Sequence, residues 1–440
     1  MIDFHMPPAI LNLKFPFNLT IDQEDAVAAW IKNKYKGSII YSTGTGKTEI
    51  AFECARRAAI NISKKVEKKN KLENLKILFL VPRIILIEQN IERLLKYNID
   101  KEYIGSFFGE KKNEREITIS TYQSASNNHF LIRNSNMVIL DEVHFVSNTA
   151  ISYSKLFNIM KEDSNKLILG LTATINELDP KYQEIIEMIP PIKKYLIKEA
   201  VEDKRLAKPE ILSSEVNLTS SEKIIYDQTS ELIRNLSFKL NAYEPNIISK
   251  ILFQGGIRSK YAKEWFNQVK IRKELLNSSQ NKLEKAAQII KNHYKEKIMV
   301  FSETIDSITK LKTLLEKNDI PSEIIHSKVK IKDRKQILEK WGHDFFPLLS
   351  VHTLEIGYDI PHVKIAIILS NTSNINQIVQ RIGRVIRKTE GKDNALIYLV
   401  HAKETRDKNL VKMVDKAVGK KSDRSFKRAT KQTKITDKFK

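Results

Sequence analysis

The amino-acid sequence predicts an α/β protein with two doubly wound parallel sheets in tandem and a mainly helical insertion between them. Short apolar runs that end in polar or small residues alternate with helically spaced segments, once between residues 38 and 174 and again between 297 and 400. This alternation is typical of parallel sheets, whose functional residues lie at the carboxyl ends of the strands. A stretch from 210 to 288 separates the two series, and its basic and aromatic residues follow a helical rhythm.

The apolar runs give the expected strands and, from them, the domain organisation. The first sheet should contain 38–43, 76–82, 117–121, 137–142 and 167–174, and the second 297–303, 322–327, 346–353, 364–370 and 395–400. We therefore expect a first α/β domain over 1–205, a helical, thumb-like insertion over 206–288 and a second α/β domain over 289–405. The basic tail over 406–440 is expected to be disordered.

Composition narrows the classes of partner and site. The 440-residue chain carries 75 Lys and Arg against 53 Asp and Glu, a formal net charge of +22. This excess favours a polyanionic partner, with a lysine-rich solvated surface as the alternative interpretation. The single cysteine, Cys54, excludes an intrachain disulfide and cysteine-rich metal centres, and its apolar surroundings indicate a core residue. No secretory leader or long apolar span is present, so we expect a cytoplasmic protein without a membrane partner.

A glycine-rich segment, "STGTGKT", follows the first expected strand and precedes a helical segment. Loops of the form G-x-x-x-x-G-K-[ST] bind phosphates through backbone N–H groups, because glycines allow close approach and the next helix adds its positive end. Tyr41 stands at the first glycine position, so an ordinary turn is the competing interpretation. In a phosphate loop, Lys47 would reach the β- and γ-phosphates and Thr48 would bind Mg²⁺. The expected nucleotide-binding residues here are Ser42, Thr43, Gly44, Thr45, Gly46, Lys47 and Thr48.

A second segment, "VILDEVH", ends an apolar run in the carboxylates Asp141 and Glu142. In a phosphate-loop fold, an Asp at a neighbouring strand end holds Mg²⁺, and an adjacent Glu accepts a proton from the attacking water. This chemistry needs both carboxylates at the same sheet edge as Lys47. Acidic pairs at strand ends are common, so only the combination with the upstream loop predicts a nucleotide hydrolase that uses ATP and Mg²⁺.

These segments, together with "LGLTAT" and "QRIGRVIR", resemble the motifs of superfamily 2 helicases in order and spacing, and "DEVH" is similar to the DExH form of motif II. The second half, "HTLEIGYDIPHVKIAIILSNTSNINQIVQRIGRVIR" followed by "ALIYLV", resembles the XPB group, archaeal members especially. The similarity covers residues 18 to 402. It implies two RecA-like domains and a DNA-dependent ATPase that moves along duplex DNA or opens it.

The resemblance also implies roles for individual residues of the first domain. Gln23 matches a glutamine that contacts adenine. His144 matches the motif II residue that links nucleotide state to strand binding, and Thr172 and Thr174 match motif III.

In the second domain, Gly357 and Asp359 match motif V, and Gln380, Arg384 and Arg387 match motif VI. The chemistry of arginine supports the last assignment, because its planar fork bonds phosphate oxygens bidentately and stabilises charge on the γ-phosphate. Basic residues at helical spacing also decorate many solvated helices, which is the alternative for Arg384 and Arg387.

The chain departs from the family pattern in three places. Thr20 and Asp22 stand where family members tend to carry Arg and Tyr, which weakens the expected base contact. Glu177 and Asp179 lie in a run that corresponds to an Arg-Glu-Asp triplet associated with strand opening, so duplex separation is less expected than ATP hydrolysis. Finally, the phosphate loop begins at residue 42, so we expect no counterpart of the N-terminal damage-recognition domain of longer relatives.

The expected nucleic-acid contacts are sequence-independent and come from strand ends and from the insertion. At strand ends the candidates are Pro82, Arg83, Thr121, Ser302, His352 and Thr353. In the insertion they are Arg258 and Lys260, with Lys263, Lys270, Arg272 and Lys273 as further basic residues. Trp265 and Phe266 are interpreted as the core of a helical hairpin rather than as base-stacking residues.

The sequence thus predicts an ATP-dependent DNA helicase or translocase, and repair or transcription-linked remodelling follows from the resemblance alone. One alternative is the motor of a restriction-type or other DNA-processing complex, with a separate nuclease or repair protein as its partner. Another is an RNA helicase. A nucleic-acid-binding scaffold with a decayed motor is the alternative outside enzymes, and the presence of Lys47, Asp141, Glu142 and Arg384 argues against it.

Overall fold

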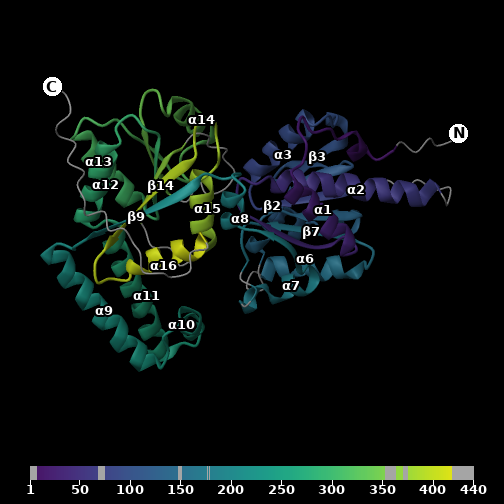
Figure 1. The fold of residues 1–440 in the computed structure, drawn as a ribbon. Helices are drawn as coiled ribbons and strands as arrows, with labels where there is room; N and C mark the ends of the chain where they lie inside the picture. The colour runs from purple at the N-terminus through teal and green to yellow at the C-terminus, as the bar shows by residue number, and fades with distance from the viewer. Residues whose placement is uncertain are drawn as a thin grey trace, which may run out of the picture. The chain divides into compact units, whose positions relative to one another are not determined.

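In the computed structural model the chain divides into two compact units between Leu206 and Ala207, each with its own sheet (Figure 1). The structure describes residues 7–67, 75–146, 151–175, 177, 179–351, 363–369 and 375–418. The two units are described separately.

The first unit is built on an eight-stranded sheet in the order β4-β3-β5-β2-β6-β7-β1-β8. Its strand pairs are parallel except the antiparallel pair β3–β4. The strands are β1 (Lys36–Tyr41), β2 (Ile77–Val81), β3 (Ile104–Phe108), β4 (Lys111–Asn113), β5 (Ile117–Thr121), β6 (Met137–Leu140), β7 (Leu167–Thr172) and β8 (Pro191–Tyr195). The five strands expected from sequence are all present. The sequence analysis missed β3, β4 and β8, whose short or charged segments lack a continuous apolar run.

Helices cover both faces of this sheet, which explains why its central strands are apolar on both sides. On one face Phe79 of β2 meets Phe52, with ring centroids 5.8 Å apart. On the other face Leu80 packs in a core with Tyr122 and Phe157. The helices are η1 (Ala9–Asn12), α1 (Ile21–Lys32), α2 (Lys47–Glu67), α3 (Ile84–Lys96), η2 (Lys101–Tyr103), α4 (Tyr122–Asn127), α5 (Phe130–Arg133), η3 (Val143–Phe145), α6 (Ile151–Glu162), η4 (Pro180–Tyr182), α7 (Gln183–Met188) and α8 (Ile197–Glu202). Cys54, in α2, is buried as expected.

The second unit contains a six-stranded, all-parallel sheet in the order β11-β12-β10-β13-β14-β9. Its strands are β9 (Lys208–Val216), β10 (Ile298–Ser302), β11 (Glu323–Ile325), β12 (Pro347–Val351), β13 (Ile365–Ile368) and β14 (Asn394–Ala402). Strand β9 corrects the expectation that the chain from 206 onward is a helical insertion, because it pairs with β14 along its whole length. It was missed because its exposed and buried residues alternate irregularly. Further helices of this unit are α12 (Gln280–Asn292), α13 (Ile305–Glu316), α14 (Ile331–Lys340) and α15 (Ile375–Val385).

The insertion itself consists of α9 (Ser220–Leu240), α10 (Pro245–Leu252) and α11 (Gly256–Asn277), which project from the second sheet in Figure 1. Helix α9 is preceded by the N-cap residue Thr219, whose side chain accepts from Glu222 N while the Glu222 carboxylate accepts from Thr219 N. This reciprocal capping satisfies two backbone donors at the helix start. Trp265 of α11 is 5% exposed and donates its indole N–H to Ser237 Oγ at 2.9 Å. The interpretation of Trp265 as core is therefore confirmed.

The disordered tail predicted to begin at residue 406 begins too early, because the chain after that residue is still helical. Residues Lys408–Ala417 form helix α16, and Leu410 and Val414 of this helix are fully buried. Their spacing of four residues places both on one face of the helix, which packs beside α15. The rest of the predicted tail, 419–440, lies outside the described residues. Within the described part of the chain, no helix combines the length and apolar content needed to cross a membrane.

We expect Trp265→Ala to lower the free energy of unfolding by about 3–5 kcal/mol, because it leaves a cavity and removes the indole hydrogen bond to Ser237 Oγ. Chemical denaturation followed by circular dichroism measures the change. Phe253→Ala is the control, since this ring is 89% exposed and its loss should change stability by less than about 0.5 kcal/mol. Equal stability of the two variants would contradict a core role for Trp265.

Candidate nucleotide-binding site

The phosphate loop connects β1, an inner strand of the first sheet, to α2. Strand β1 lies between β7 and β8, and α2 begins at Lys47. Gly44 and Gly46 have φ angles of 88° and 85°, a left-handed conformation that glycine adopts without steric cost. The chain can therefore reverse direction tightly before the helix, whose positive end then faces the loop.

Gln23 of α1 packs directly against this loop. Its Nε2 donates to Thr45 O at 3.0 Å, and its Oε1 accepts from Thr20 N at 3.0 Å. A Cβ at Gly46 would clash with Gln23 Nε2, so a larger residue there would displace the Gln23 amide as well as strain the backbone. Each end of the Gln23 amide has a protein partner and retains one further hydrogen-bonding position.

The acidic pair follows β6, which lies two strands from β1 with β7 between them. Asp141 Oδ1 accepts from Glu142 N at 3.0 Å, and the Asp141 carbonyl accepts from Tyr122 Oη at 2.7 Å. Glu142 has φ 50° and ψ 51°, a left-handed conformation that costs an ordinary residue roughly 1–2 kcal/mol. Such strain concentrates at functional sites, where the surrounding structure maintains it.

The structure brings the loop and the acidic pair together, as the sequence analysis required. Lys47 Nζ lies 3.8 Å from Glu142 Oε1 and donates to Tyr41 O at 3.2 Å. Burial raises the pKa of the Asp141 carboxyl, and the negative charge of Glu142 raises it further, while Lys47 opposes both effects. A second positive charge beside the pair would favour the ionised carboxylate.

His144 and the strand β7 residue Thr172 also meet at this edge. The His144 Nδ1 and Thr172 Oγ1 atoms are 2.9 Å apart, and Thr172 Oγ1 donates to Thr174 O at 2.9 Å. His144 Nδ1 is 3.4 Å from Glu142 Oε2. Side-chain contacts thus connect the phosphate loop, the acidic segment after β6 and the end of β7.

Two observations bear on the fit of a nucleotide and its metal. The hydroxyls of Ser42 and Thr43 are buried and have no hydrogen-bond partner among the described residues, which suits donation to a bound anion. The described residues contain no group of three or more His, Cys, Asp and Glu that would hold a metal ion alone. Mg²⁺ does not need one, because it keeps water and phosphate ligands and takes one or two from the protein. Thr48 and Asp141 fit that limited role.

In the second unit, the residues expected to contact phosphate lie on or just after α15. Gln380 and Arg384 are buried, and Arg381 lies over the Phe301 ring, 5.8 Å from its centroid. The chain beyond α15 is held by Lys392, whose Nζ donates to Val385 O and, at 3.0 Å, to Arg387 O. The expected residues Gly357 and Asp359 lie outside the described residues.

The expected nucleic-acid contacts divide into three groups. Arg83 and Thr121 follow or end β2 and β5, which are parallel neighbours, so these residues and Pro82 lie at the edge where Asp141 lies. Ser302 is fully buried and bonded to Ser307, so the expectation that its hydroxyl contacts nucleic acid is corrected. Thr353 and His352 lie outside the described residues.

Within the insertion, Lys260 is exposed, as a phosphate contact requires. Arg258 is exposed as well, but its Nη2 donates to Leu240 O at 2.7 Å and so ties α11 to the end of α9. Arg272 is buried and donates to Ser230 Oγ at 3.3 Å, so it belongs to the helix packing rather than to the surface. These positions share a positive charge and differ in burial, which the sequence did not reveal.

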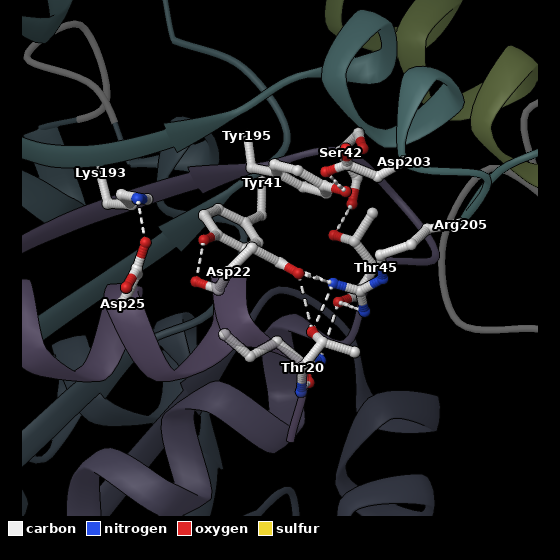
Figure 2. Close-up of polar contacts among 11 residues, drawn as sticks. Thr20, Asp22, Asp25, Tyr41, Ser42, Thr45, Lys193, Tyr195, Asp203 and Arg205 are labelled. Carbon is white, nitrogen blue, oxygen red and sulfur yellow. Dashed lines mark hydrogen bonds and ion pairs between the residues drawn. The ribbon is translucent and has the colours of Figure 1, made fainter. Parts of the chain in front are cut away.

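Sequence reasoning missed Arg205, which lies near the C-terminal end of the first unit's sequence and contacts the phosphate loop. Its Nη2 donates to Thr45 O at 2.9 Å, and its Nη1 pairs with Asp22 (Figure 2). Arg205 belongs to no motif and stands in an ordinary charged segment, "VEDKRLAKP". The only signal was the unusual acid at Asp22, which needs a positive partner.

Comparison with known proteins matches both units. Residues 16–177 match the family described as type III restriction enzyme, res subunit, and residues 281–389 match the helicase conserved C-terminal domain. The chain is similar to the DNA 3'-5' translocase XPB2 of Sulfurisphaera tokodaii, with 30% identity over 88% of this chain and 82% of that protein. It is also similar to the DNA 3'-5' helicase XPB of Kineococcus radiotolerans, with 22% identity over 86% of this chain and 58% of that protein.

Among solved structures, the helicase domain of Pyrococcus furiosus Hef is similar with a TM-score of 0.57 and 21% identity, covering 89% of this chain and 97% of that one. At this level of identity the likeness shows the fold. Both sheets of the present chain therefore belong to RecA-like domains, as the sequence predicted.

Lys392 gives a pH-dependent prediction. Burial lowers its pKa to about 8, and the charges of Arg387 and Lys364 contribute. Between pH 8 and the ordinary lysine value near 10.5, the unfolded chain binds more protons than the folded chain, so stability rises with pH. We expect the denaturation midpoint of the wild-type protein, relative to that of Lys392→Met, to rise as the pH increases from 8 to 10. A difference that stays flat or shrinks over this range would contradict the burial of a charged ammonium.

Proposed function

This chain belongs to the XPB-like group of superfamily 2 helicases, and on that premise we propose that it couples ATP hydrolysis to movement along DNA or to local opening of DNA. Membership confirms the resemblance expected from the motifs. It also makes the chain an ATP hydrolase. The observation that supports the proposed mechanism most directly is the 3.8 Å approach of Lys47 to Glu142 at the edge that carries the phosphate loop.

In the proposed mechanism the first unit binds the nucleotide and activates the attacking water. Lys47 exchanges its contact with Glu142 for oxygens of the β- and γ-phosphates, while the unpaired Ser42 and Thr43 hydroxyls donate to the nucleotide. Glu142 then accepts the proton of the attacking water. His144 contacts both Glu142 and Thr172, so a change in the contacts of Glu142 also changes those of His144.

Thr48 and Asp141 are proposed to hold Mg²⁺, which neutralises charge on the phosphate oxygens when bound. The second unit is proposed to supply Arg384 and Arg387 to the γ-phosphate, with Gln380 supporting the site and Gly357 and Asp359 contributing nucleotide contacts. Arginine fits this task because its fork matches two phosphate oxygens at once.

The proposed substrate is DNA bound without regard to sequence. The net charge of +22 favours a polyanion, and Arg83 and Lys260 are proposed to contact its backbone. The Thr121 hydroxyl is buried and bonded to Ser124, so the expectation that it contacts nucleic acid is not carried into this proposal. A role in repair or in transcription-linked remodelling, with a nuclease or other repair protein as partner, is the finer form of this proposal. The match of residues 16–177 to a restriction-enzyme family keeps a restriction-type motor as the second candidate.

The phosphate-loop assignment predicts that Lys47→Ala lowers ATP turnover by about 10²-fold or more, because one positioned phosphate donor is lost. The colorimetric release of phosphate measures turnover, and circular dichroism verifies the fold. Lys32→Ala is the control, since Lys32 is an exposed lysine on α1. Unchanged turnover in Lys47→Ala would refute the assignment.

The choice of substrate predicts that duplex DNA stimulates ATP turnover more than RNA does at one fixed low salt concentration. Single-stranded DNA, duplex DNA and RNA of equal length are compared, and the salt concentration is then raised. Stimulation should fall steeply with salt because binding releases counterions. Stimulation by RNA alone would instead favour an RNA helicase, and no hydrolysis with any polymer would favour a scaffold.

A further inference from the structure

Arg205 lies in the turn after α8, one residue before the boundary at Leu206, yet its side chain reaches the beginning of α1 and the phosphate loop (Figure 2). Its Nη1 donates to Asp22 Oδ1 at 2.6 Å and to Thr20 Oγ1 at 2.8 Å. Its Nη2 donates to Thr45 O at 2.9 Å. One guanidinium therefore joins three segments that are far apart in the sequence.

The Thr45 carbonyl accepts two hydrogen bonds, from Arg205 Nη2 and from Gln23 Nε2. The peptide between Thr45 and Gly46 is planar and trans, so fixing its carbonyl on one side fixes the Gly46 N–H on the opposite side. Thr45 is fully buried, and its hydroxyl donates to Ser42 O at 2.8 Å, which holds the peptide further. The orientation of a phosphate-binding amide is thus set before a nucleotide binds.

The position of Arg205 is itself well determined. Asp22 is held through its backbone, since its carbonyl accepts from Tyr41 Oη at 2.6 Å. The guanidinium lies 5.7 Å from the centroid of the Tyr195 ring, and Tyr195 Oη donates to Asp203 Oδ2 at 2.8 Å. The Arg205 and Asp22 side chains are only 20% and 16% exposed, so solvent screens their attraction weakly.

The contact accounts for a departure noted in the sequence. Thr20 and Asp22 replace the Arg and Tyr that the family tends to carry ahead of Gln23, and both residues bond to Arg205. An acid at this position would repel a nearby triphosphate if it were unpaired. Its pairing with Arg205 compensates that charge, and the guanidinium also donates to the loop.

We propose that Arg205 is a positioning residue for the nucleotide: held by Asp22, it fixes the Thr45–Gly46 peptide so that the Gly46 amide is directed at the triphosphate. The inference rests on the proposed function, because it concerns the same phosphate loop. Lysine cannot replace Arg205, since a single ammonium does not span the Asp22 carboxylate and the Thr45 carbonyl in fixed geometry.

The test compares Arg205→Gln, Arg205→Lys and Asp22→Asn with the wild-type protein. For each, the KM and kcat of ATP hydrolysis, the Kd of a fluorescent ATP analogue and the thermal midpoint without nucleotide are measured. We expect Arg205→Gln to raise KM and Kd about tenfold, as for loss of a hydrogen bond to a charged group, with kcat changed less than about threefold. Asp22→Asn keeps the side-chain shape and should raise KM in the same direction even if Arg205→Gln folds poorly.

The matched control is Lys193→Gln. Lys193 pairs with Asp25 at 3.0 Å, so it also ties helix α1 to the sheet, but no contact of Lys193 with the phosphate loop is present among the described residues (Figure 2). A general stabilising role predicts similar effects of Lys193→Gln and Arg205→Gln on KM. Positioning predicts a normal KM for Lys193→Gln and a raised KM for Arg205→Lys despite its retained charge.

Unchanged KM and Kd in both Arg205→Gln and Asp22→Asn would overturn the inference, as would an equal increase in Lys193→Gln. Measuring Lys47→Ala in parallel separates this result from failure of the proposed function. If Lys47→Ala loses turnover while the Arg205 variants bind ATP normally, only the positioning role is wrong. If Lys47→Ala keeps full turnover, the phosphate-loop mechanism itself is wrong.

Discussion

The candidate site depends on one constraint of the first sheet: β1, β7 and β6 are consecutive and parallel, so the segments that follow β1 and β6 emerge at the same edge. Parallel strands all present their carboxyl ends on one side, which is why α/β enzymes assemble sites there. Lys47 and Glu142 are 95 positions apart in the chain, yet this strand order brings their charged atoms to 3.8 Å. A different strand order would leave the same two motifs without a shared chemistry.

A second layer of contacts holds that edge in a single geometry. The phosphate loop is bonded from behind by Gln23 and Arg205, and Asp141 is fixed by Tyr122 through its carbonyl. Glu142, next to Asp141, has a left-handed backbone, a conformation that persists only where the surrounding structure maintains it. A site that is rigid before binding spends less of its interaction energy on ordering itself, so more is left for the nucleotide.

The insertion shows that residues of one chemical class, aromatic or basic, can differ in burial and therefore in role. Trp265 lies in the core between α9 and α11, whereas Phe253, before α11, is almost fully exposed. Arg272 bonds to a neighbouring helix, whereas Lys260 faces solvent. Basic and aromatic content alone therefore does not define a nucleic-acid surface, because helix packing uses part of it.

The sequence by itself determined the features that depend on neighbours along the chain. Apolar runs gave the central strands of both sheets, and the order of glycines, lysine and carboxylates located the phosphate loop and the acidic pair. These signals are local, because a buried strand or a tight glycine turn is specified by a few adjacent residues.

Only the tertiary structure decided the features that depend on distant partners. Strand β9 pairs with β14 from the opposite end of the second unit, and Arg205 meets Asp22 across 183 positions. Such contacts form only when distant segments come together in the folded chain. They leave no periodic pattern in the sequence, because each partner contributes a single residue or one strand edge.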